Sequence, residues 1–144
     1  MATEQLFQIG IKAVAQNDKG EILLLAVPQW GDNPAHWDLP GGRMEPGEDF
    51  LQTLRREIKE EIGIDYDGPA EHMATVLSNI TIPVGETRVP LVLMPYRVQL
   101  PQDATIVLDP NGPEQEFEWC APEVAAERLL RKYPAEFCNA VKEL

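Results

Sequence analysis

Apolar and polar positions along the first part of the chain predict two paired strands. Residues 6–16 mix apolar and polar side chains in a strand-like pattern, and residues 21–27 form a continuous apolar run that suits a buried strand. The connecting residues 17–20, Asn-Asp-Lys-Gly, are typical of a tight β-turn. We therefore expect these two strands to lie side by side.

The second half of the chain contains two longer β-rich runs, residues 70–83 and 86–100, which we expect to form a hairpin around residues 84–85. Pro90 and Pro95 lie inside the second run. Because proline has no backbone N–H to donate to a neighbouring strand, these residues favour an edge position or bulges for that run.

The remaining elements are short strands and helices. Strands are expected at residues 36–39 and 116–120, and helices at about 48–62, at 122–132 and again from Pro134. The last helix directs three apolar side chains towards the core: Phe137, Val141 and Leu144. Strands combined with one early helix and two late ones indicate an α/β or α+β sandwich, and 144 residues are enough for one domain with a single core.

The helix at residues 48–62 has two different faces. Glu57, Glu60 and Glu61 fall within a sector roughly 100° wide. Like charges at these spacings destabilise an isolated helix by a few tenths of a kcal/mol per pair, and a hard cation with oxygen ligands would offset that repulsion. The alternative is a solvated acidic face. The adjoining face carries an apolar stripe expected to pack on the core: Leu51, Leu54, Ile58 and Ile62.

The residues around this helix resemble the signature of the Nudix hydrolases, G-x5-E-x7-R-E-U-x-E-E-x-G-U, in which U is a bulky aliphatic residue. A chance match to the fixed positions is on the order of one in 10⁸ per start position at typical residue frequencies. Every specified position is met: Gly42, Glu48, Arg56, Glu57, Ile58, Glu60, Glu61, Gly63 and Ile64.

The resemblance implies an α/β fold, specifically a Nudix-type α/β/α sandwich around a mixed β-sheet, formed by residues 1–144 as a single Nudix hydrolase domain. It also implies hydrolysis of a nucleoside diphosphate linked to another moiety, with Mg²⁺ or Mn²⁺ as cofactor. The implied metal ligands are the carboxylates of Glu57, Glu60 and Glu61 and the backbone carbonyl of Gly42.

Two further signature residues have an implied structural role. In the family, the position of Glu48 pairs with that of Arg56, which orients the glutamates. Arginine suits this task because its guanidinium binds a carboxylate in a bidentate fork and remains charged. Arg55 has no fixed role in the family, and we expect it at the surface.

The general base is either a glutamate of the signature or a carboxylate from a later loop. The later candidates are Glu114, Glu116 and Glu118. We favour Glu114 because it follows the loop at residues 111–113, Asn-Gly-Pro, which could swing over the metal.

Candidates for substrate contacts come from loops and strands outside the signature. Trp30 lies in a loop rich in Gly and Pro, so we expect it to be exposed, whereas Trp37 is expected to pack in the core. His36 could donate a hydrogen bond to a phosphate or a base. Strand alternation leaves open which face Arg88 and Tyr96 occupy. The candidate substrate-binding residues are Trp30, His36, Arg88 and Tyr96.

Composition excludes several partner classes. With 12 basic and 24 acidic residues the net charge is −12, which disfavours binding to nucleic acid or to an anionic membrane. A metal ion would supply local positive charge for an anionic substrate. No secretory signal and no run of 18 apolar residues is visible, so we expect a cytoplasmic protein. Cys120 and Cys138 lack metal or redox spacing and are expected to be reduced.

The resemblance leaves the substrate open. The proline of ADP-ribose pyrophosphatases is replaced here by Asn79, the tyrosine of dinucleoside polyphosphate hydrolases is missing from residues 80–82, and no coenzyme A marker precedes the signature. By elimination we expect a small nucleotide, a (deoxy)nucleoside triphosphate cut to the monophosphate and pyrophosphate. The alternatives are a nucleotide-sugar or ADP-ribose substrate, or a non-catalytic nucleotide sensor. A homodimer, common in the family, is also an open alternative.

Overall fold

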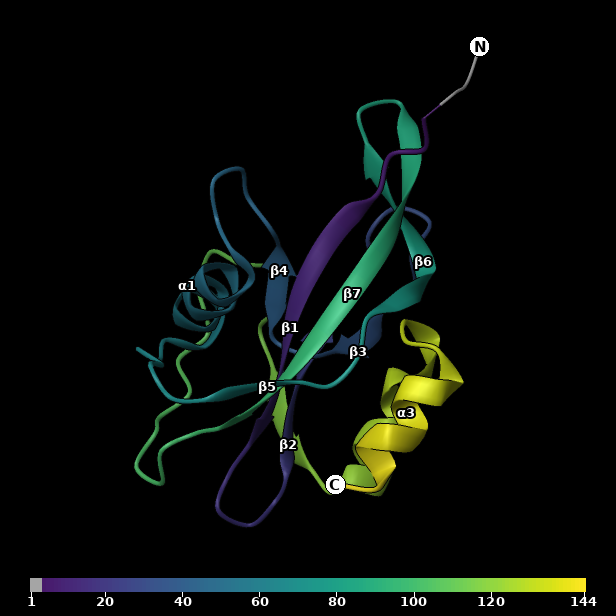
Figure 1. Ribbon diagram of the computed structural model, residues 1–144. Helices are drawn as coiled ribbons and strands as arrows, with labels where there is room; N and C mark the ends of the chain where they lie inside the picture. The colour runs from purple at the N-terminus through teal and green to yellow at the C-terminus, as the bar shows by residue number, and fades with distance from the viewer. Residues whose placement is uncertain (1–3) are drawn as a thin grey trace.

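The computed structural model describes residues 4–144, so the first three residues of the N-terminal segment lie outside the described part. Within it four strands precede the first helix, four more strands follow that helix, and the other helical segments come at the C-terminal end (Figure 1). The elements are β1 (Gln8–Gln16), β2 (Ile22–Val27), β3 (His36–Asp38), β4 (Gly41–Arg43), α1 (Phe50–Ile62), β5 (Ala70–His72), β6 (Val76–Val84), β7 (Thr87–Gln99), β8 (Phe117–Cys120), α2 (Pro122–Arg128), the 3-10 helix η1 (Leu129–Arg131) and α3 (Ala135–Lys142).

The centre of the mixed sheet is the parallel pair β1 and β7, in register from Gln8 opposite Leu91 to Gln16 opposite Gln99. On its other edge β1 pairs antiparallel with β2 and β4, and β2 in turn pairs with β3 and β8. The far edge of β7 pairs antiparallel with β5 and β6. The predicted pairing of the first two strands and the predicted hairpin of β6 and β7 are both confirmed.

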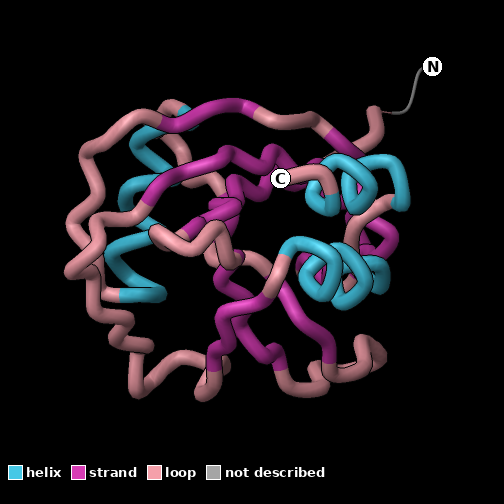
Figure 2. Tube along the Cα trace, turned by 90° about the horizontal axis from the view of Figure 1, so that it is seen from below, coloured by secondary structure: helices cyan, strands magenta, loops and turns pink. Residues whose placement is uncertain are grey.

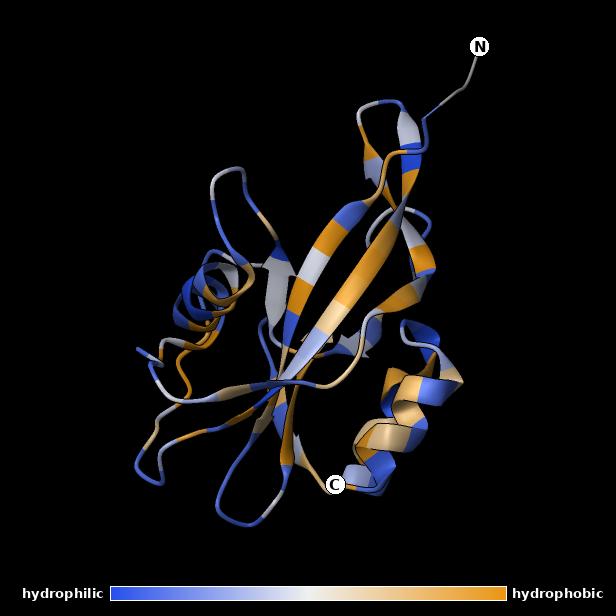
Figure 3. Ribbon diagram, viewed as in Figure 1, coloured by the Kyte–Doolittle hydropathy of each residue, from blue (hydrophilic) through white to orange (hydrophobic). Residues whose placement is uncertain are grey.

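Helices cover both faces of this sheet (Figures 1 and 2), which confirms the α/β/α sandwich. Alternate residues of β1 point to opposite sides: Ile11 and Ala13 pack with α1, whereas Val14 packs with α2 and α3. Both central strands carry orange, apolar residues in Figure 3. Phe137 and Val141 of α3 are buried in the core that lies between the sheet and helices α2 and α3, as predicted. No helix within residues 4–144 is long and apolar enough to cross a membrane.

Helix α1 is bounded by specific capping contacts. It begins at Phe50 rather than at residue 48, because Asp49 forms a capping box in which its side chain accepts from the N–H of Gln52 at 2.8 Å. It ends at Gly63, whose φ of 75° is left-handed and whose N–H donates to the Lys59 carbonyl at 3.0 Å. The signature glycine at position 63 therefore serves to end the helix.

The predicted apolar stripe of α1 is right at three positions and wrong at the fourth. Leu54, Ile58 and Ile62 are fully buried, but Leu51 is 40% exposed. The helix is rotated so that Thr53 and Glu57 face the sheet instead, and both are buried. This rotation directs Glu57 towards the sheet, where the short strand β4 lies.

Of the two alternatives predicted for the strand that contains Pro90 and Pro95, the edge position is wrong, because β7 pairs along both of its edges, whereas a bulge-like irregularity is present in its pairing with β6. The prolines coincide instead with irregular pairing on one side. The expected strand at residues 70–83 is divided into β5 and β6, and neither of them pairs with Pro95. Next to Pro90, which is opposite Thr81, the β6 register shifts between Leu77 and Thr81.

The two cysteines, Cys120 and Cys138, are buried free thiols, as expected. Burial raises the pKa of the Cys138 thiol to about 11, so this group stays protonated near neutral pH. Trp37 packs partly against the core on the α2 and α3 side. The guanidinium of Arg128 lies 4.6 Å from the centre of the Trp37 ring.

Candidate active site

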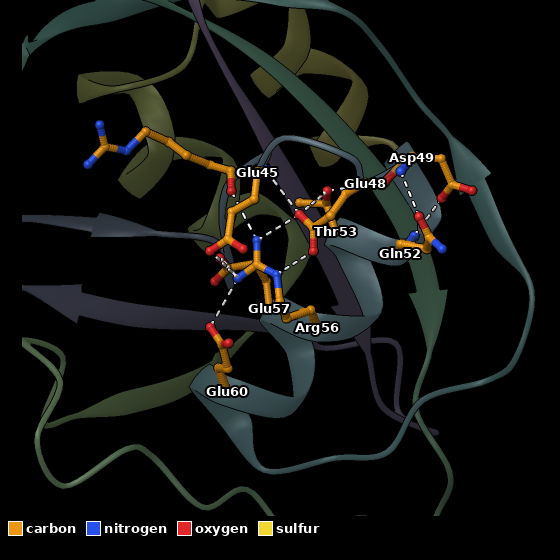
Figure 4. Close-up of polar contacts among 9 residues, drawn as sticks. Glu45, Glu48, Asp49, Gln52, Thr53, Arg56, Glu57 and Glu60 are labelled. Carbon is orange, nitrogen blue, oxygen red and sulfur yellow. Dashed lines mark hydrogen bonds and ion pairs between the residues drawn. The ribbon is translucent and has the colours of Figure 1, made fainter.

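Arg56 on α1 connects three of the four acidic residues of the signature, Glu48, Glu57 and Glu60 (Figure 4). Its Nε and Nη2 donate to the two carboxylate oxygens of Glu48 at 2.6 and 3.0 Å, which is a bidentate pair. Its Nη1 donates to Glu57 Oε1 at 2.8 Å and to Glu60 Oε2 at 3.2 Å. Nη2 also donates to the Arg43 carbonyl at 3.1 Å, so one guanidinium ties α1 to β4.

Glu48 is held as a carboxylate at the start of this network. Hydrogen bonds from Arg56, aided by the Glu45 N–H and the Thr53 hydroxyl, lower the pKa of Glu48 to about 2. An ionised Glu48 fixes the guanidinium plane, and Arg56 in turn sets the directions of Glu57 and Glu60. The expected Glu48–Arg56 pair is present.

The two glycines of β4 allow its backbone to approach the carboxylates of α1. A Cβ on Gly42 would lie 2.4 Å from Glu57 Oε1, and a Cβ on Gly41 would lie 2.1 Å from the Ile11 carbonyl. The Gly41 N–H donates to Glu61 Oε1 at 3.0 Å. Only a pair of glycines leaves room for this arrangement, in which the Glu57 and Glu61 carboxylates both lie against the β4 backbone.

Both of these carboxylates are costly to ionise in the protein alone. Burial raises the pKa of Glu57, although Arg56 opposes the shift. Burial also raises the pKa of Glu61 to about 8, against the attraction of Lys12 and the Gly41 N–H and with added repulsion from Glu114. Negative charge at this position is therefore only partly compensated by protein groups.

A divalent cation fits the donor set of these residues. Glu57, Glu60 and Glu61 each use one oxygen in the hydrogen bonds described above, and their second oxygens form none with residues 4–144. Carboxylate and carbonyl oxygens are the ligands that hard cations prefer. With the side chains as they stand, residues 4–144 contain no ready-made cluster of three acidic, His or Cys ligands, and the Glu60 side chain is more exposed than that of Glu57. The fit therefore rests mainly on Glu57 and Glu61 beside Gly42.

Of the three later acidic residues, only Glu114 lies beside the signature. It borders a hollow of about 230 Å³ together with Glu60 and Glu61. Glu116 is exposed, and the Glu118 carboxylate pairs with Arg128 of α2. Position therefore separates Glu114 from Glu116 and Glu118, and the signature glutamates stay candidates for the general base beside it.

A second, larger cleft adjoins this hollow through Pro113 and Glu114. Its volume is about 400 Å³, and it lies on the sheet face that packs against α2 and α3, where Ile82 belongs to the core. Two of the predicted substrate residues, Trp30 and His36, line it. Trp30 is 54% exposed, as expected for a loop residue that could stack on a ligand.

The other two predicted substrate residues lie elsewhere. Tyr96 is only 7% exposed and belongs to the core under α1, with its ring edge-on to His72, so its assignment to the cleft is wrong. The reason is strand alternation, which turns Tyr96 to the sheet face opposite the cleft. Arg88 donates to the Thr81 hydroxyl at 2.8 Å and lies outside the cleft lining. Its Nη2 is 3.5 Å from Oδ1 of Asn33, a residue that does line the cleft.

The floor of the cleft is a buried charged network that the sequence interpretation missed. Lys132 Nζ donates to Asp38 Oδ2 at 2.5 Å and Lys12 Nζ donates to the same oxygen at 3.1 Å. The Tyr133 hydroxyl donates to Asp38 Oδ1 at 2.6 Å. One signal in the sequence was available: Lys12 interrupts the apolar run of the first strand, with buried residues on both sides.

Attraction between the charges of this network opposes the effect of burial on each of them. Burial would raise the pKa of Asp38, but attraction to Lys12 and Lys132 holds that pKa well below its usual range. Burial would lower the pKa of Lys12, yet attraction to Asp38 and Glu61 raises it. Burial lowers the pKa of Lys132, although Asp38 opposes that shift. Asp38 therefore stays ionised as the shared partner of the two lysines.

The raised pKa of Glu61 leads to a testable pH dependence of stability. In the folded protein without metal this group titrates near pH 8, whereas a glutamate in the unfolded chain titrates near 4.5. Between these values the folded state binds more protons, so the free energy of unfolding falls as pH rises. Because glutamine does not ionise, Glu61→Gln removes this fall in the free energy of unfolding. In EDTA at pH 9 we expect Glu61→Gln to be more stable than the unmodified protein by ~1–3 kcal/mol, or several degrees in Tm.

Thermal unfolding followed by circular dichroism at pH 5 and pH 9 measures this effect. Glu136→Gln, on the exposed surface of α3, serves as the control and should leave the two Tm values unchanged. An equal Tm for Glu61→Gln and the unmodified protein at pH 9 would show that Glu61 is not destabilising when ionised.

Comparison with known proteins extends these observations. Residues 6–140 match the family model described as the NUDIX domain. The CTP pyrophosphohydrolase of Escherichia coli (strain K12) is 40% identical over 55 residues, which are 38% of this chain and 40% of that protein. Nucleoside triphosphatase NudI of Salmonella heidelberg (strain SL476) is 48% identical over 48 residues, 33% of this chain and 34% of that protein. The chain thus aligns with 40% or less of the length of these two relatives.

A solved structure extends the similarity to nearly the whole chain. The crystal structure of the MutT NUDIX hydrolase from Burkholderia pseudomallei has a TM-score of 0.70 at 21% identity and covers 97% of this chain and 99% of that chain. At this identity the likeness shows a shared fold. Because the family model covers residues 6–140 and all nine signature positions are present, the chain belongs to the Nudix family.

Proposed function

We propose that this chain is a metal-dependent pyrophosphohydrolase that cleaves a nucleoside diphosphate linked to another group, with a (deoxy)nucleoside triphosphate as substrate and a nucleoside monophosphate and pyrophosphate as products. The observation that carries the proposal is the position of Glu57 and Glu61 against the Gly41–Gly42 backbone, next to a cleft of nucleotide size. The two curated relatives described above, a CTP pyrophosphohydrolase and a nucleoside triphosphatase, support this choice of substrate.

The residues proposed to hold the metal are Glu57, Glu60 and Glu61 with the Gly42 carbonyl. The Nudix family generally uses a divalent metal, and we propose Mg²⁺ or Mn²⁺ here. When bound, such an ion neutralises diphosphate oxygens and acidifies an attacking water. Arg56 presents Glu57 and Glu60 to the site, and Glu48 keeps Arg56 in place.

Glu114 is proposed to take the proton from the attacking water. It is the carboxylate that borders both the hollow beside Glu61 and the larger cleft, so it lies where the reacting phosphate and the nucleoside would meet. Trp30 and His36 line the same cleft and are proposed to contact the nucleotide. A cytoplasmic location of the protein is also proposed.

A substrate panel tests the proposal. Ribonucleoside and deoxyribonucleoside triphosphates, ADP-ribose and nucleotide sugars are incubated with Mg²⁺, and the products are separated by anion-exchange chromatography. We expect a triphosphate to give monophosphate and pyrophosphate. Faster turnover of ADP-ribose or a nucleotide sugar would move the substrate to that class, and no turnover of any compound would contradict the enzymatic function.

A further inference from the structure

The floor of the cleft presents hydrogen-bond donors towards its interior and has no free acceptor on Asp38. Four donors already occupy the two Asp38 oxygens: the Leu39 N–H and the Tyr133 hydroxyl on Oδ1, and the ammonium groups of Lys12 and Lys132 on Oδ2. A bound ligand therefore cannot place an N–H on this carboxylate without displacing one of these partners.

The two lysines keep unused donors that can serve a ligand. An ammonium group has three N–H bonds. Lys12 uses two of them, on Asp38 and on the Leu39 carbonyl at 3.1 Å, and Lys132 uses one, on Asp38. Both side chains line the 400 Å³ cleft, so their remaining donors are available to a molecule bound there.

Lys132 is held in place by its own backbone as well as by Asp38. The Lys132 carbonyl accepts from the Ser78 hydroxyl and from the Asn79 N–H, both at 2.8 Å. The Asn79 side-chain amide also donates to the carbonyls of Leu130 and Tyr133, each at 2.9 Å. These bonds join β6 to the segment around η1, so the donors at the floor have a fixed position relative to the cleft wall.

The walls of the cleft are suited to a planar ring. They are formed largely by apolar side chains, with the exposed indole of Trp30 on one side and Ile80 and Ile82 of β6 also contributing. A nucleobase can be covered by such walls while its edge meets the polar floor. The phosphates would then lie towards Glu114 and the glutamates of α1.

We infer that Lys12 and Lys132, fixed by Asp38, make the cleft selective for nucleobases that present a carbonyl oxygen at the edge where adenine and cytosine carry an amino group. At this floor a carbonyl accepts from the free lysine donors, whereas an amino group placed there would meet donors only, because the Asp38 oxygens are already occupied, and it would lose the hydrogen bonds that it makes in water. This inference rests on the proposed function, because it specifies the nucleotide that the same site takes.

Two matched nucleotide pairs test the inference. Among the purine nucleotides, ITP has a carbonyl group where ATP has an amino group. Among the pyrimidine nucleotides, UTP and CTP differ in the same way. We expect kcat/KM to be at least ~10-fold higher for the carbonyl member of one or both pairs. Lys132→Met removes two unused donors while Lys12 still pairs with Asp38, and it should reduce this preference to less than about 3-fold.

The experiment separates the base from the phosphates as the group that the lysines bind. If Lys132→Met lowered kcat/KM equally for both members of each pair, the lysine would bind phosphate and the inference would be wrong. Equal kcat/KM for ITP and ATP and for UTP and CTP in the unmodified protein would also overturn it. Lys132→Arg, which keeps charge and donors, should retain part of the preference, and Lys142→Met on the exposed side of α3 should retain all of it.

A binding measurement keeps this inference distinct from the proposed hydrolysis. Titration calorimetry with the monophosphates IMP, AMP, UMP and CMP requires no turnover. Tighter binding of IMP over AMP, or of UMP over CMP, by ~10-fold supports the inference even if no triphosphate is hydrolysed. Equal binding within both pairs, or no binding of any monophosphate, contradicts it irrespective of the hydrolytic activity.

Discussion

Replacing Glu61 with Gln is expected to lower kcat by about 10³-fold or more with Mg²⁺ and a nucleoside triphosphate that the protein hydrolyses. The substitution keeps an oxygen that can accept from the Gly41 N–H, so the local fold should persist. It removes the negative charge proposed to bind the metal. The loss should therefore appear in turnover and in metal affinity, with a far-ultraviolet circular dichroism spectrum that is unchanged.

The control for this prediction is Glu136→Gln, an exposed glutamate on α3. Its kcat should stay within about 2-fold of that of the unmodified protein, since surface substitutions away from a site have small effects. Turnover by Glu61→Gln within 10-fold of the unmodified protein would exclude Glu61 as an essential metal ligand.

Asp38→Ala is expected to be the most destabilising single change in the charged network, with a loss of ~3–5 kcal/mol in the free energy of unfolding. Asp38 is buried and accepts from two buried ammonium groups. Without it, Lys12 and Lys132 would face each other as uncompensated charges. Urea denaturation at pH 7, monitored by tryptophan fluorescence, measures the difference.

Asp65→Ala provides a matched comparison. Asp65 also pairs with a lysine, Lys59, at 3.2 Å, but both side chains are mostly exposed. Exposed ion pairs of this kind contribute ~1 kcal/mol or less. If the two aspartate substitutions cost the same, the buried network would have no special role in stability.

Local patterns were sufficient to predict most of the fold. The hairpins, the helix of the signature and the late helices depend on spacings of a few residues, which the sequence displays directly. The errors occurred where tertiary packing decided the outcome. Leu51 has the spacing of a core residue, but α1 is rotated towards Glu57 and Thr53. β7 lies inside the sheet rather than at its edge, although it has the irregular pairing that was the other alternative for Pro90 and Pro95.

The candidate site likewise contains some contacts between residues that are close in the sequence and others between residues that only the fold brings together. The Arg56 network joins residues at most 13 positions apart, so a short motif describes most of it. Asp38 and Lys132 are 94 positions apart in the chain and meet only because β3 and η1 lie side by side in the fold. Tyr96 shows the reverse case, in which a plausible residue type occupies the wrong face of its strand.

The central claim is that Glu57 and Glu61 hold the divalent metal required for hydrolysis, and titration of Mn²⁺ followed by electron paramagnetic resonance tests it most directly. We expect the unmodified protein to bind Mn²⁺, and the double variant Glu57→Gln with Glu61→Gln to bind it at least ~100-fold more weakly, with turnover lost in parallel. Mn²⁺ binding of equal strength in the double variant, or full turnover by the unmodified protein after complete chelation with EDTA, would contradict the claim.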